Sequence, residues 1–580
     1  MNRKAISGIV LTLVLVGILT LTSNVQLLKA RGTIYIREDG SIDPDDERII
    51  TEDLVHYYFV DDIYDNLVIK RSNITINGAG YTLEGTGRDY GVDIDNSDPL
   101  YAVENVTIKN MKIHRFYIGI LITSSQNCSI FGNTITDCNE WGIELSGSSE
   151  NRIYGNYITN SDNGINFEEA SNNNFVNGNV IANNHQNGIE IHQLSSNNSI
   201  FENNITTNFR YGVIIQGSPN NRIWGNNITG NSGLRNIQSA IEVTNSPNNR
   251  IYENKIAFNK DYGLLFENSS NNLVYENEIA NNGNDGLFFS HSSYNTVYNN
   301  EILNNTHGIV ISGSNSISIF GNKIANNTKG IFLGQSNNAT IFENNIKANK
   351  EIGVSLEFGS YYSTLYHNNF VDNAQQVYIY GSTGVWDDGY PSGGNYWSDY
   401  NGSDKCWGEG QTLSGSDMIG DTPYVIIERL PYKDRYPLME RWPMLNCWYF
   451  EDNRVMIISD SSIADFGFNK KRGEITFNVA VDKSDFSKLI VSKLLLDGAF
   501  NFYIDNLLSV FPVGWSSKFH MINLTYSQGN HSIKIIGEYT SPCTPECPDV
   551  NRDGIIDIFD VILVAKCLGK TPEEIWDQQT

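Results

Sequence analysis

The side chains with the most specific chemistry lie near the C-terminus. Over residues 549–560, oxygen-bearing side chains recur at the spacing of a calcium loop, with Gly554 at the position where the backbone must turn sharply. The seventh position offers its backbone carbonyl, and the twelfth is an aspartate. Hard carboxylate and amide oxygens are the ligands that Ca²⁺ prefers. The sequence therefore predicts calcium as a cofactor, held by Asp549, Asn551, Asp553, Ile555, Asp557 and Asp560.

A second group of side chains has acid–base chemistry. Glu144, Glu168, Glu190 and His192 fall at corresponding places of neighbouring sequence repeats, so they are expected to form one carboxylate-rich patch. Glycoside hydrolases use paired carboxylates about 5–10 Å apart. If the protein is an enzyme, these four residues are its predicted catalytic residues. The alternative interpretation is a group of solvated surface acids.

A third feature is one aromatic residue in nearly every repeat. If Ile130 and its equivalents point inward, the residue that follows each of them points outward. Such a column offers a platform for sugar rings or a partner, or it stacks on itself and stiffens the protein. The predicted ligand-binding residues are Phe131, Tyr154, Phe201, Trp224, Tyr252, Tyr275 and Tyr298.

The elements that position these side chains are short and repeated. An asparagine returns every 22 to 24 residues, with one step of 28, from Asn133 to Asn368, and a Gly-Ile marker keeps the same period. Triplets such as Ser129–Phe131 alternate apolar and polar residues, as strands do, and turn residues separate them. This pattern predicts a right-handed parallel β-helix whose recurrent asparagines form a ladder from coil to coil.

The whole chain is predicted to be all-β except for one C-terminal helix. Arg3 and Lys4 precede an apolar run of about 16 residues, which is short for a membrane span and typical of an export signal. A small β-sandwich follows the tail. The predicted parts are a signal peptide or anchor (1–30), the β-helix with capping coils to about 117 (31–383), a tail (384–445), the sandwich (446–540) and a calcium-loop helix (541–580).

The tail and the cysteines allow further expectations. The acids Asp399, Asp404, Asp417 and Asp421 are expected either to hold a second Ca²⁺ or to cap the last coil. Disulfides are plausible between Cys128 and Cys138, between Cys406 and Cys447, and within the C-terminal segment. An outward apolar strip is predicted to be covered by the tail or the sandwich, and it consists of Ile214, Leu265, Phe288, Val310 and Phe332.

The coil motifs "IFGNTI" and "IYENEI" and the tail motifs "WDDGYPSGGNYWSDYNGSD", "GSDMIGDTPYVI" and "DRYPLM" resemble the NosD family of carbohydrate-binding/sugar-hydrolysis β-helices, in its archaeal form. The segment at 549–568 resembles a single dockerin repeat. These resemblances imply a secreted or surface-attached protein, and they make a cohesin-like partner conceivable. Named NosD members help copper-enzyme maturation, but here the nine histidines are scattered and the seven methionines form no cluster.

The charge of the chain restricts its partners. A formal net charge of −26 argues against nucleic acid and anionic membranes as partners. Association with a membrane is expected only through an N-terminal segment that is not cleaved. We expect a protein that binds polysaccharide or surface glycans. A polysaccharide hydrolase or lyase is the first alternative, although the compact Asp-Asp, Gly-His-Gly and Arg-x-Lys motifs of β-helical pectinases are missing. A structural surface protein or NosD-like accessory factor is the second.

Overall fold

The fold is that of a computed structural model. It describes residues 32–94, 103–231, 239–390, 392–415, 418–427, 432–442 and, with short gaps, 447–539. Every regular element in these ranges is a β-strand. No helix of the described part is long and apolar enough to cross a membrane. The predicted N-terminal signal and the predicted calcium loop lie outside the described residues.

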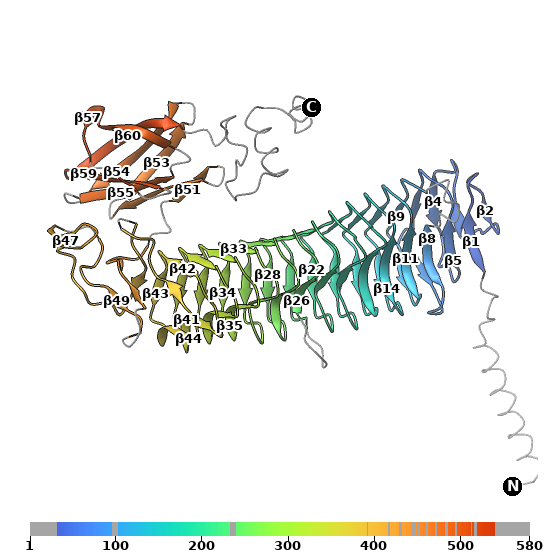
Figure 1. The fold of residues 1–580 in the computed structure, drawn as a ribbon. Coiled ribbons are helices and arrows are strands. Elements are labelled where there is room, and N and C mark those ends of the chain that lie inside the picture. Colours follow the sequence, from blue (N-terminus) through green and yellow to red (C-terminus); the bar gives the residue numbers. More distant parts are fainter. Residues whose placement is uncertain are drawn as a thin grey trace, which may run out of the picture. The chain divides into compact units, whose positions relative to one another are not determined.

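The first 16-stranded sheet forms one wall of a parallel β-helix, as predicted (Figure 1). Its strands, in spatial order, are β2 (Ile42–Asp43), β1 (Thr33–Ile36), β5 (Asn66–Ile69), β8 (Tyr90–Ile94), β11 (Ile118–Thr123), β14 (Trp141–Ser146), β17 (Asn163–Glu168), β20 (Ile189–Ile191), β23 (Val213–Gln216), β26 (Ser239–Thr244), β29 (Tyr262–Glu267), β32 (Leu287–Ser290), β35 (His307–Ser312), β38 (Lys329–Gly334), β41 (Ile352–Glu357) and β44 (Gln375–Tyr380).

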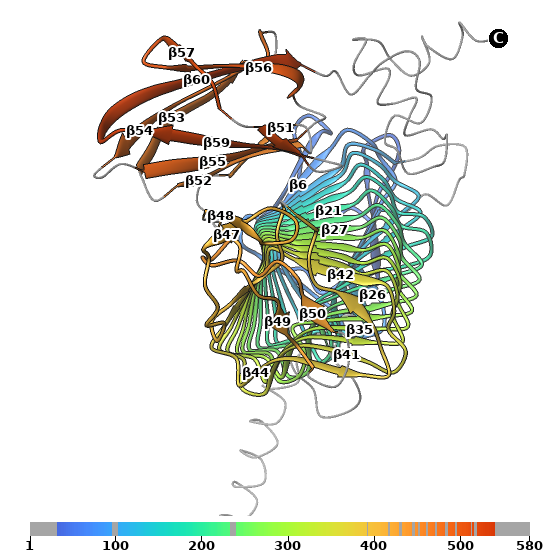
Figure 2. The same cartoon turned by 60° about the vertical axis from the view of Figure 1, so that its left-hand side comes forward.

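Two further parallel sheets complete each coil (Figure 2). The second sheet begins at β7 (Thr82–Glu84) and continues with triplets such as β13 (Thr134–Thr136) and β25 (Asn227–Thr229). The third begins with β3 (Ile49–Ile50) and β4 (His56–Phe59) and includes β12 (Ser129–Phe131), β21 (Ser199–Phe201), β24 (Arg222–Trp224), β27 (Arg250–Tyr252), β30 (Leu273–Tyr275), β33 (Thr296–Tyr298) and β36 (Ser318–Phe320). At the N-terminal end β1–β2 and β3–β4 pair antiparallel.

The Gly-Ile marker is explained by how closely the coils approach. A Cβ added to Gly164 would lie 2.2 Å from the carbonyl oxygen of Gly188 on the next coil and 2.5 Å from the Ile181 side chain. The aliphatic residue after each of these glycines fills the core, as Ile143 and Ile165 do with no exposed surface. A larger residue at the glycine would therefore push neighbouring coils apart.

The recurrent asparagine forms the predicted ladder. Asn226 is buried, its Nδ2 donates to Asn254 Oδ1 at 2.9 Å, and its own Oδ1 accepts from Asn203. The residue before each rung has a left-handed backbone, with φ of 63° at Gly225 and 55° at Glu253. Three more ladders run inside the corners, and they include Asn174 and Asn198, Asn231 and Asn259, and Ser246 and Ser269.

Cys128 and Cys138 carry free thiols, so the predicted disulfide between them is wrong. The two residues occupy different corner ladders of one coil, because the Cys128 amide donates to Asn151 Oδ1 and the Cys138 amide donates to Ser161 Oγ. Burial raises the pKa of each thiol to about 11. Cys406 is also free, which excludes its predicted bridge.

The chain divides into two units by contact, and the second comprises residues 340–346, 362–372 and 383 onward. It contains strands of the last coils, β42 (Ser363–Tyr366), β43 (Asn369–Val371), β45 (Gly384–Val385) and β46 (Tyr396–Trp397). β42 pairs in parallel with β45, and β43 pairs in parallel with β46. Parallel coil pairing therefore reaches Trp397, beyond the predicted boundary at 383.

The C-terminal part of the second unit has two antiparallel five-stranded sheets. The strands of the first sheet are, in spatial order, β51 (Cys447–Phe450), β52 (Asn453–Ser459), β55 (Asp485–Ser492), β59 (Phe519–Tyr526) and β58 (Val513–Trp515). The strands of the second sheet are, in spatial order, β53 (Ser462–Asn469), β54 (Glu474–Val481), β60 (Gly529–Tyr539), β56 (Leu496–Ile504) and β57 (Leu507–Ser509). Residues of both sheets, among them Val455, Phe477 and Ile522, share one hydrophobic cluster.

Candidate functional site

The outward face of the first sheet carries a polar patch over β14, β17, β20, β23 and β26. On β14, Ile143 and Leu145 fill the core, and Trp141, Glu144 and Ser146 lie on the other face. The parallel register repeats these three positions on the following coils. We call this surface the polar face, and its other members are Asn163, Asn166, Glu168, Asn187, Glu190, His192, Tyr211, Ile214, Gln216, Ser239, Glu242 and Thr244.

Three of the four predicted acid–base residues meet at the centre of the polar face. The carboxyl groups of Glu144 and Glu168 share a hydrogen bond, and His192 Nε2 lies 3.6 Å from Glu168 Oε2. Glu144 is 9% exposed, and burial together with the Glu168 charge raises the pKa of Glu144 to about 8. Because two carboxylates in contact repel each other, one of them holds a proton at neutral pH.

Neighbouring amides contact Glu190 and His192, and the predicted site residues do not include these amides. Asn187 Nδ2 donates to Glu190 Oε2 at 2.9 Å, and Asn166 Oδ1 lies 3.0 Å from His192 Nε2. The sequence signal was available, because Asn166 and Asn187 occupy the outward positions of their repeats. Glu190 itself lies two strands from Glu144 in the same column.

The shifted pKa of Glu144 makes the stability of the fold depend on pH. The folded state binds a proton that the unfolded state has lost, so stability is full below about pH 4.5 and falls as pH rises towards about 8. Glu144→Gln mimics the protonated group. In acid, thermal unfolding is expected to give the same melting temperature for the parent protein and the variant. Above pH 8 the variant is expected to be more stable than the parent by about 2 kcal/mol. Glu278→Gln, at an exposed residue, is the control. If the melting temperatures of the parent protein and both variants depend on pH in the same way, the raised pKa of Glu144 is contradicted.

A second polar pair lies farther along the same face. Asp285 Oδ1 and His307 Nδ1 are 2.6 Å apart, and the carboxylate orients an imidazole that is 28% exposed. The predicted apolar strip runs past this pair, and its Phe332 ring lies 6.4 Å from the His307 ring. Its side chains are partly covered by their own sheet, since the Tyr262 ring stacks on Phe288 at 5.6 Å and Lys329 lies over Phe332. Coverage of the strip by the tail or the sandwich stays a prediction.

The aromatic column is a self-stacked ladder. Phe201, Trp224, Tyr252, Tyr275, Tyr298 and Phe320 stack in sequence, with ring centroids 4.5–5.7 Å apart and planes within 5° of parallel. Phe131 and Tyr154 form a separate stacked pair. Each inner ring therefore has both faces covered by its neighbours. The ladder presents ring edges to a ligand, and the stacking supports the stiffening interpretation.

Removing one ring of the ladder tests this interpretation. Trp224→Ala breaks two stacked contacts and is expected to cost roughly 1–3 kcal/mol in the free energy of unfolding. Thermal and urea unfolding measure the loss. The matched control is Tyr157→Ala, because Tyr157 is 45% exposed on the second sheet. Equal effects of the two substitutions would mean that the stacking does not stabilise the coils.

The described residues contain no group of three or more histidine, cysteine or acidic side chains that could hold a metal ion. Three of the predicted tail acids, Asp399, Asp404 and Asp421, are hydrogen-bonded within the tail, and Asp417 lies outside the described residues. Asp421 accepts hydrogen bonds from the Lys405 and Cys406 amides, and Asp399 accepts one from the Tyr424 hydroxyl. Whether these acids cap the last coil or hold a second Ca²⁺ stays a prediction. The six predicted ligands at 549–560 lie outside the described residues, so their site stays a prediction.

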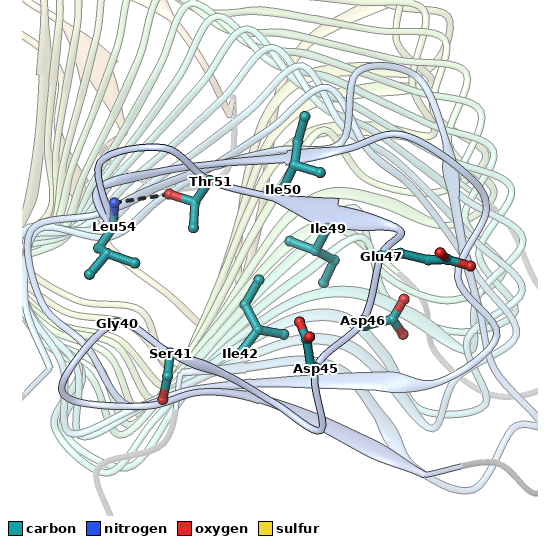
Figure 3. Close-up of a pocket in the computed structure, with 10 residues that line it drawn as sticks. All are labelled: Gly40, Ser41, Ile42, Asp45, Asp46, Glu47, Ile49, Ile50, Thr51 and Leu54. Carbon is teal, nitrogen blue, oxygen red and sulfur yellow. Dashed lines mark hydrogen bonds between the residues drawn. The ribbon is translucent and has the colours of Figure 1, made fainter.

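A pocket of about 360 Å³ lies at the N-terminal end of the β-helix (Figure 3). Ile42, Ile49 and Leu54 line it together with acidic side chains, and the Leu54 amide donates to Thr51 Oγ1. Asp46, one of these acids, is hydrogen-bonded to Arg48. The pocket carries none of the predicted site residues.

Several proteins of known structure resemble the chain. The periplasmic alginate epimerase AlgG is 14% identical, with 61% of this chain and 84% of that chain covered and a TM-score of 0.31. The alginate lyase from Paenibacillus sp. str. FPU-7 is 14% identical, with coverages of 46% and 94% and a TM-score of 0.24. PfbA, a surface adhesin of Streptococcus pneumoniae, is 12% identical, with coverages of 49% and 82% and a TM-score of 0.31. Likenesses at this level say nothing about activity. No curated protein matches the sequence.

The sequence profile of one family matches the β-helix. The family is described as "Periplasmic copper-binding protein (NosD)", and it matches residues 62–257 and 232–402. The two matches together span more than half of the 580 residues and include the coils that carry the polar face. The chain belongs to the NosD family.

Proposed function

We propose that this NosD-family protein is exported and binds polysaccharide or surface glycans on its polar face. The periplasmic description of the family supports export. One observation carries the binding proposal: carboxylates, amides and a histidine cluster on a regular, outward sheet surface, with Trp141 and Tyr211 at its margins. Sugar hydroxyls both donate and accept hydrogen bonds, and these groups are suitable partners for them.

The size of the polar face fits a chain-like ligand. The face covers five neighbouring strands, which at about 4.8 Å per strand gives about 19 Å along the β-helix axis. A repeated surface of this kind favours a repeated ligand over a single small molecule. Ring edges of the stacked ladder lie on a different sheet, so they are not needed for this site.

A glycan array with the purified full-length protein tests the proposal. We expect binding to a subset of glycans, and we expect Glu168→Gln to weaken it. Glu168 is only partly buried, with a side chain 25% exposed, so the substitution should leave the fold intact. Glu278→Gln on the second sheet is the control and should bind as the parent does. Absence of binding to every glycan would overturn the proposal and favour a structural role.

A polysaccharide hydrolase is the second candidate, and one geometric observation favours a particular pair. Glu144 and Glu168 are in direct contact, which is too close for the two carboxyl groups of a glycosidase. Glu144 and Glu190 lie two strands, or about 10 Å, apart, close to the spacing of inverting enzymes. Protonated Glu144 would be the acid and Glu190 the base. Release of reducing ends that is lost in Glu190→Gln would support this function.

Copper does not fit the described residues. Copper sites use thiolate, thioether or clustered imidazole ligands. Cys128 and Cys138 lie buried at separate corners with raised pKa values, and described histidines hydrogen-bond to carboxylate, amide, hydroxyl and backbone carbonyl oxygens. We therefore propose no copper-dependent reaction for this part of the chain. An accessory role of the NosD type would have to use residues beyond it.

We further propose that the two C-terminal sheets form a β-sandwich and that residues 541–580 form one dockerin-like calcium repeat. The loop at 549–560 is expected to bind about one Ca²⁺, and Asp553→Ala is expected to abolish that site because it removes a carboxylate ligand. Calorimetry on the full chain, compared with the variant, measures the difference. Equal calcium uptake by both proteins would contradict the prediction. A cohesin-like partner is proposed for this repeat, of which the sequence contains one.

A further inference from the structure

We propose that asparagines at exposed turns of the β-helix carry N-linked glycans, and that the strand asparagines with the same sequence motif do not. The proposed sites are Asn197, Asn268 and Asn338. This inference goes beyond glycan binding and rests only on the export proposed above. It follows from where the fold places the Asn-x-Ser/Thr triplets, which are the acceptors of N-glycosylation in exported proteins.

Ten such triplets lie in the β-helix, and eight of them begin at a turn. The eight asparagines are exposed and have φ angles of 50–60°, and they are Asn73, Asn105, Asn127, Asn197, Asn268, Asn304, Asn326 and Asn338. Asparagine adopts this left-handed backbone more readily than most residues with a side chain. The turns therefore favour asparagine, and an oligosaccharide attached there would extend into solvent.

The buried asparagines of the ladder from Asn133 to Asn368 begin no such triplet. Asn226, for example, is followed two residues later by Ile228, which fills the core with no exposed surface. Because side chains alternate across a strand, the second residue after each rung faces inward and is apolar. A sugar on Asn226 Nδ2 would also displace its bond to Asn254. The fold thus keeps the motif away from the ladder, which needs these amide nitrogens.

Two triplets begin within strands of the second sheet, at Asn204 on β22 (Asn204–Thr206) and at Asn227 on β25. Both asparagines are half-buried, and Asn227 Nδ2 donates to Asn204 Oδ1 at 2.7 Å. The amide nitrogen that would carry a sugar on Asn227 is therefore part of a contact between neighbouring coils. Parallel strands lie about 4.8 Å apart, so a sugar here would press on the coils on either side. These two sites are expected to stay unmodified.

Crowding separates the eight turn sites into two groups. Five of them have another triplet at the same turn of a neighbouring coil, and they are Asn73, Asn105, Asn127, Asn304 and Asn326. Asn105 Nδ2 already donates to Asn73 Oδ1 at 2.9 Å. Two glycans about 4.8 Å apart would compete for the same space. The three proposed sites have no such neighbour, because the residues at the same turn of the adjacent coils begin no triplet.

The modification transfers an oligosaccharide from a lipid-carrier phosphate on the outer side of the exporting membrane. A bond forms between the first sugar carbon and Asn197 Nδ2, and the bond from that carbon to the carrier phosphate breaks. The amide nitrogen loses one proton to the solvent, the lipid phosphate leaves, and nothing is oxidised or reduced. The hydroxyl two residues later completes the acceptor motif. At Asn197 it belongs to Ser199, on the outer side of β21.

Peptide mass spectrometry on the full-length protein purified from its own cells tests the proposal. We expect added sugar mass on the peptides of the three proposed sites, and none on the peptides with Asn204 and Asn227. Cleavage after Glu202 places Asn197 and Asn204 on different peptides. The same chain produced in the cytoplasm of a bacterium that lacks N-glycosylation is the reference without added mass.

A pair of variants made in the same cells separates the motif from the turn. Ser199→Ala removes the hydroxyl and should abolish the added mass at Asn197, whereas Ser199→Thr keeps the hydroxyl and should retain the mass. Thr107 and Thr296 occupy the equivalent outward position on other coils, so threonine fits there. Thermal unfolding of both variants checks that the fold persists.

The outcomes separate this inference from the proposed export. If the protein is recovered outside the cell membrane without sugar at the three sites, the inference is wrong and export stands. If the protein remains in the cytoplasm, export fails and the inference fails with it. Equal added mass on Asn204 and Asn227 would show that the fold does not select the sites. Added mass retained at Asn197 in Ser199→Ala would show that the attachment is not N-glycosylation of this triplet.

Discussion

Asn226→Ala is expected to destabilise the β-helix by roughly 3–6 kcal/mol, far more than most surface substitutions do. Asn226 is 1% exposed. Its Nδ2 donates to Asn254 Oδ1 and to the carbonyls of Ile200 and Trp224, all within 3.0 Å. Its Oδ1 accepts from both the backbone and the side chain of Asn203. Alanine removes all five bonds and leaves buried donors and acceptors unpaired.

The adjacent residue provides a matched control for this prediction. Asn227 is half-buried on the outer side of the second sheet, and its side chain makes one hydrogen bond, to Asn204 Oδ1 at 2.7 Å. Asn227→Ala should therefore cost less than about 1 kcal/mol. Urea unfolding followed by circular dichroism measures both losses, and hydrogen exchange shows whether the coils next to Asn226 open first. Similar midpoints for the two variants would show that the ladder contributes little to stability.

Asp434→Asn is expected to loosen the cap at the end of the coils and to cost roughly 2–4 kcal/mol. Asp434 is fully buried and accepts hydrogen bonds from the Asn395 amide at 2.7 Å, the Trp397 indole at 2.9 Å and the Tyr436 amide at 3.0 Å. Burial raises the pKa of Asp434, although these three N–H donors stabilise its ionised form. An asparagine has one acceptor oxygen, so its NH₂ group must face at least one of the three donors.

The position of Asp434 links two parts of the tail. Asn395 is the last rung of the asparagine ladder in the second unit, because its Oδ1 accepts from Asn368, and Trp397 stacks on Phe370 at 4.3 Å. Lys433→Gln, at the exposed neighbouring residue, is the control. Tryptophan fluorescence during thermal unfolding should report an earlier transition in Asp434→Asn only. A transition unchanged from that of the parent protein would show that the carboxylate is not the group that fixes the cap.

The sequence alone determined the architecture because the β-helix is a repeat. Each coil contacts mainly its neighbours, so a period of 22 to 24 residues fixes which residues stack on one another. The ladder from Asn133 to Asn368 and the column that contains Glu144 and Glu190 could both be read from this spacing. The close approach at Gly164 and Gly188 also follows from it, since glycine recurs at this position in most coils.

The tertiary structure decided how neighbouring side chains use their hydrogen bonds, charges and ring faces. Sequence spacing placed Trp224 and Tyr252 one coil apart, but only the rotamers show that their faces cover each other. In the same way, the sequence placed Cys128 and Cys138 in one coil, whereas the corner positions of their backbones keep the thiols apart. The contact between Glu144 and Glu168 joins different columns of adjacent strands. Such diagonal contacts depend on side-chain direction, which a one-dimensional period does not contain.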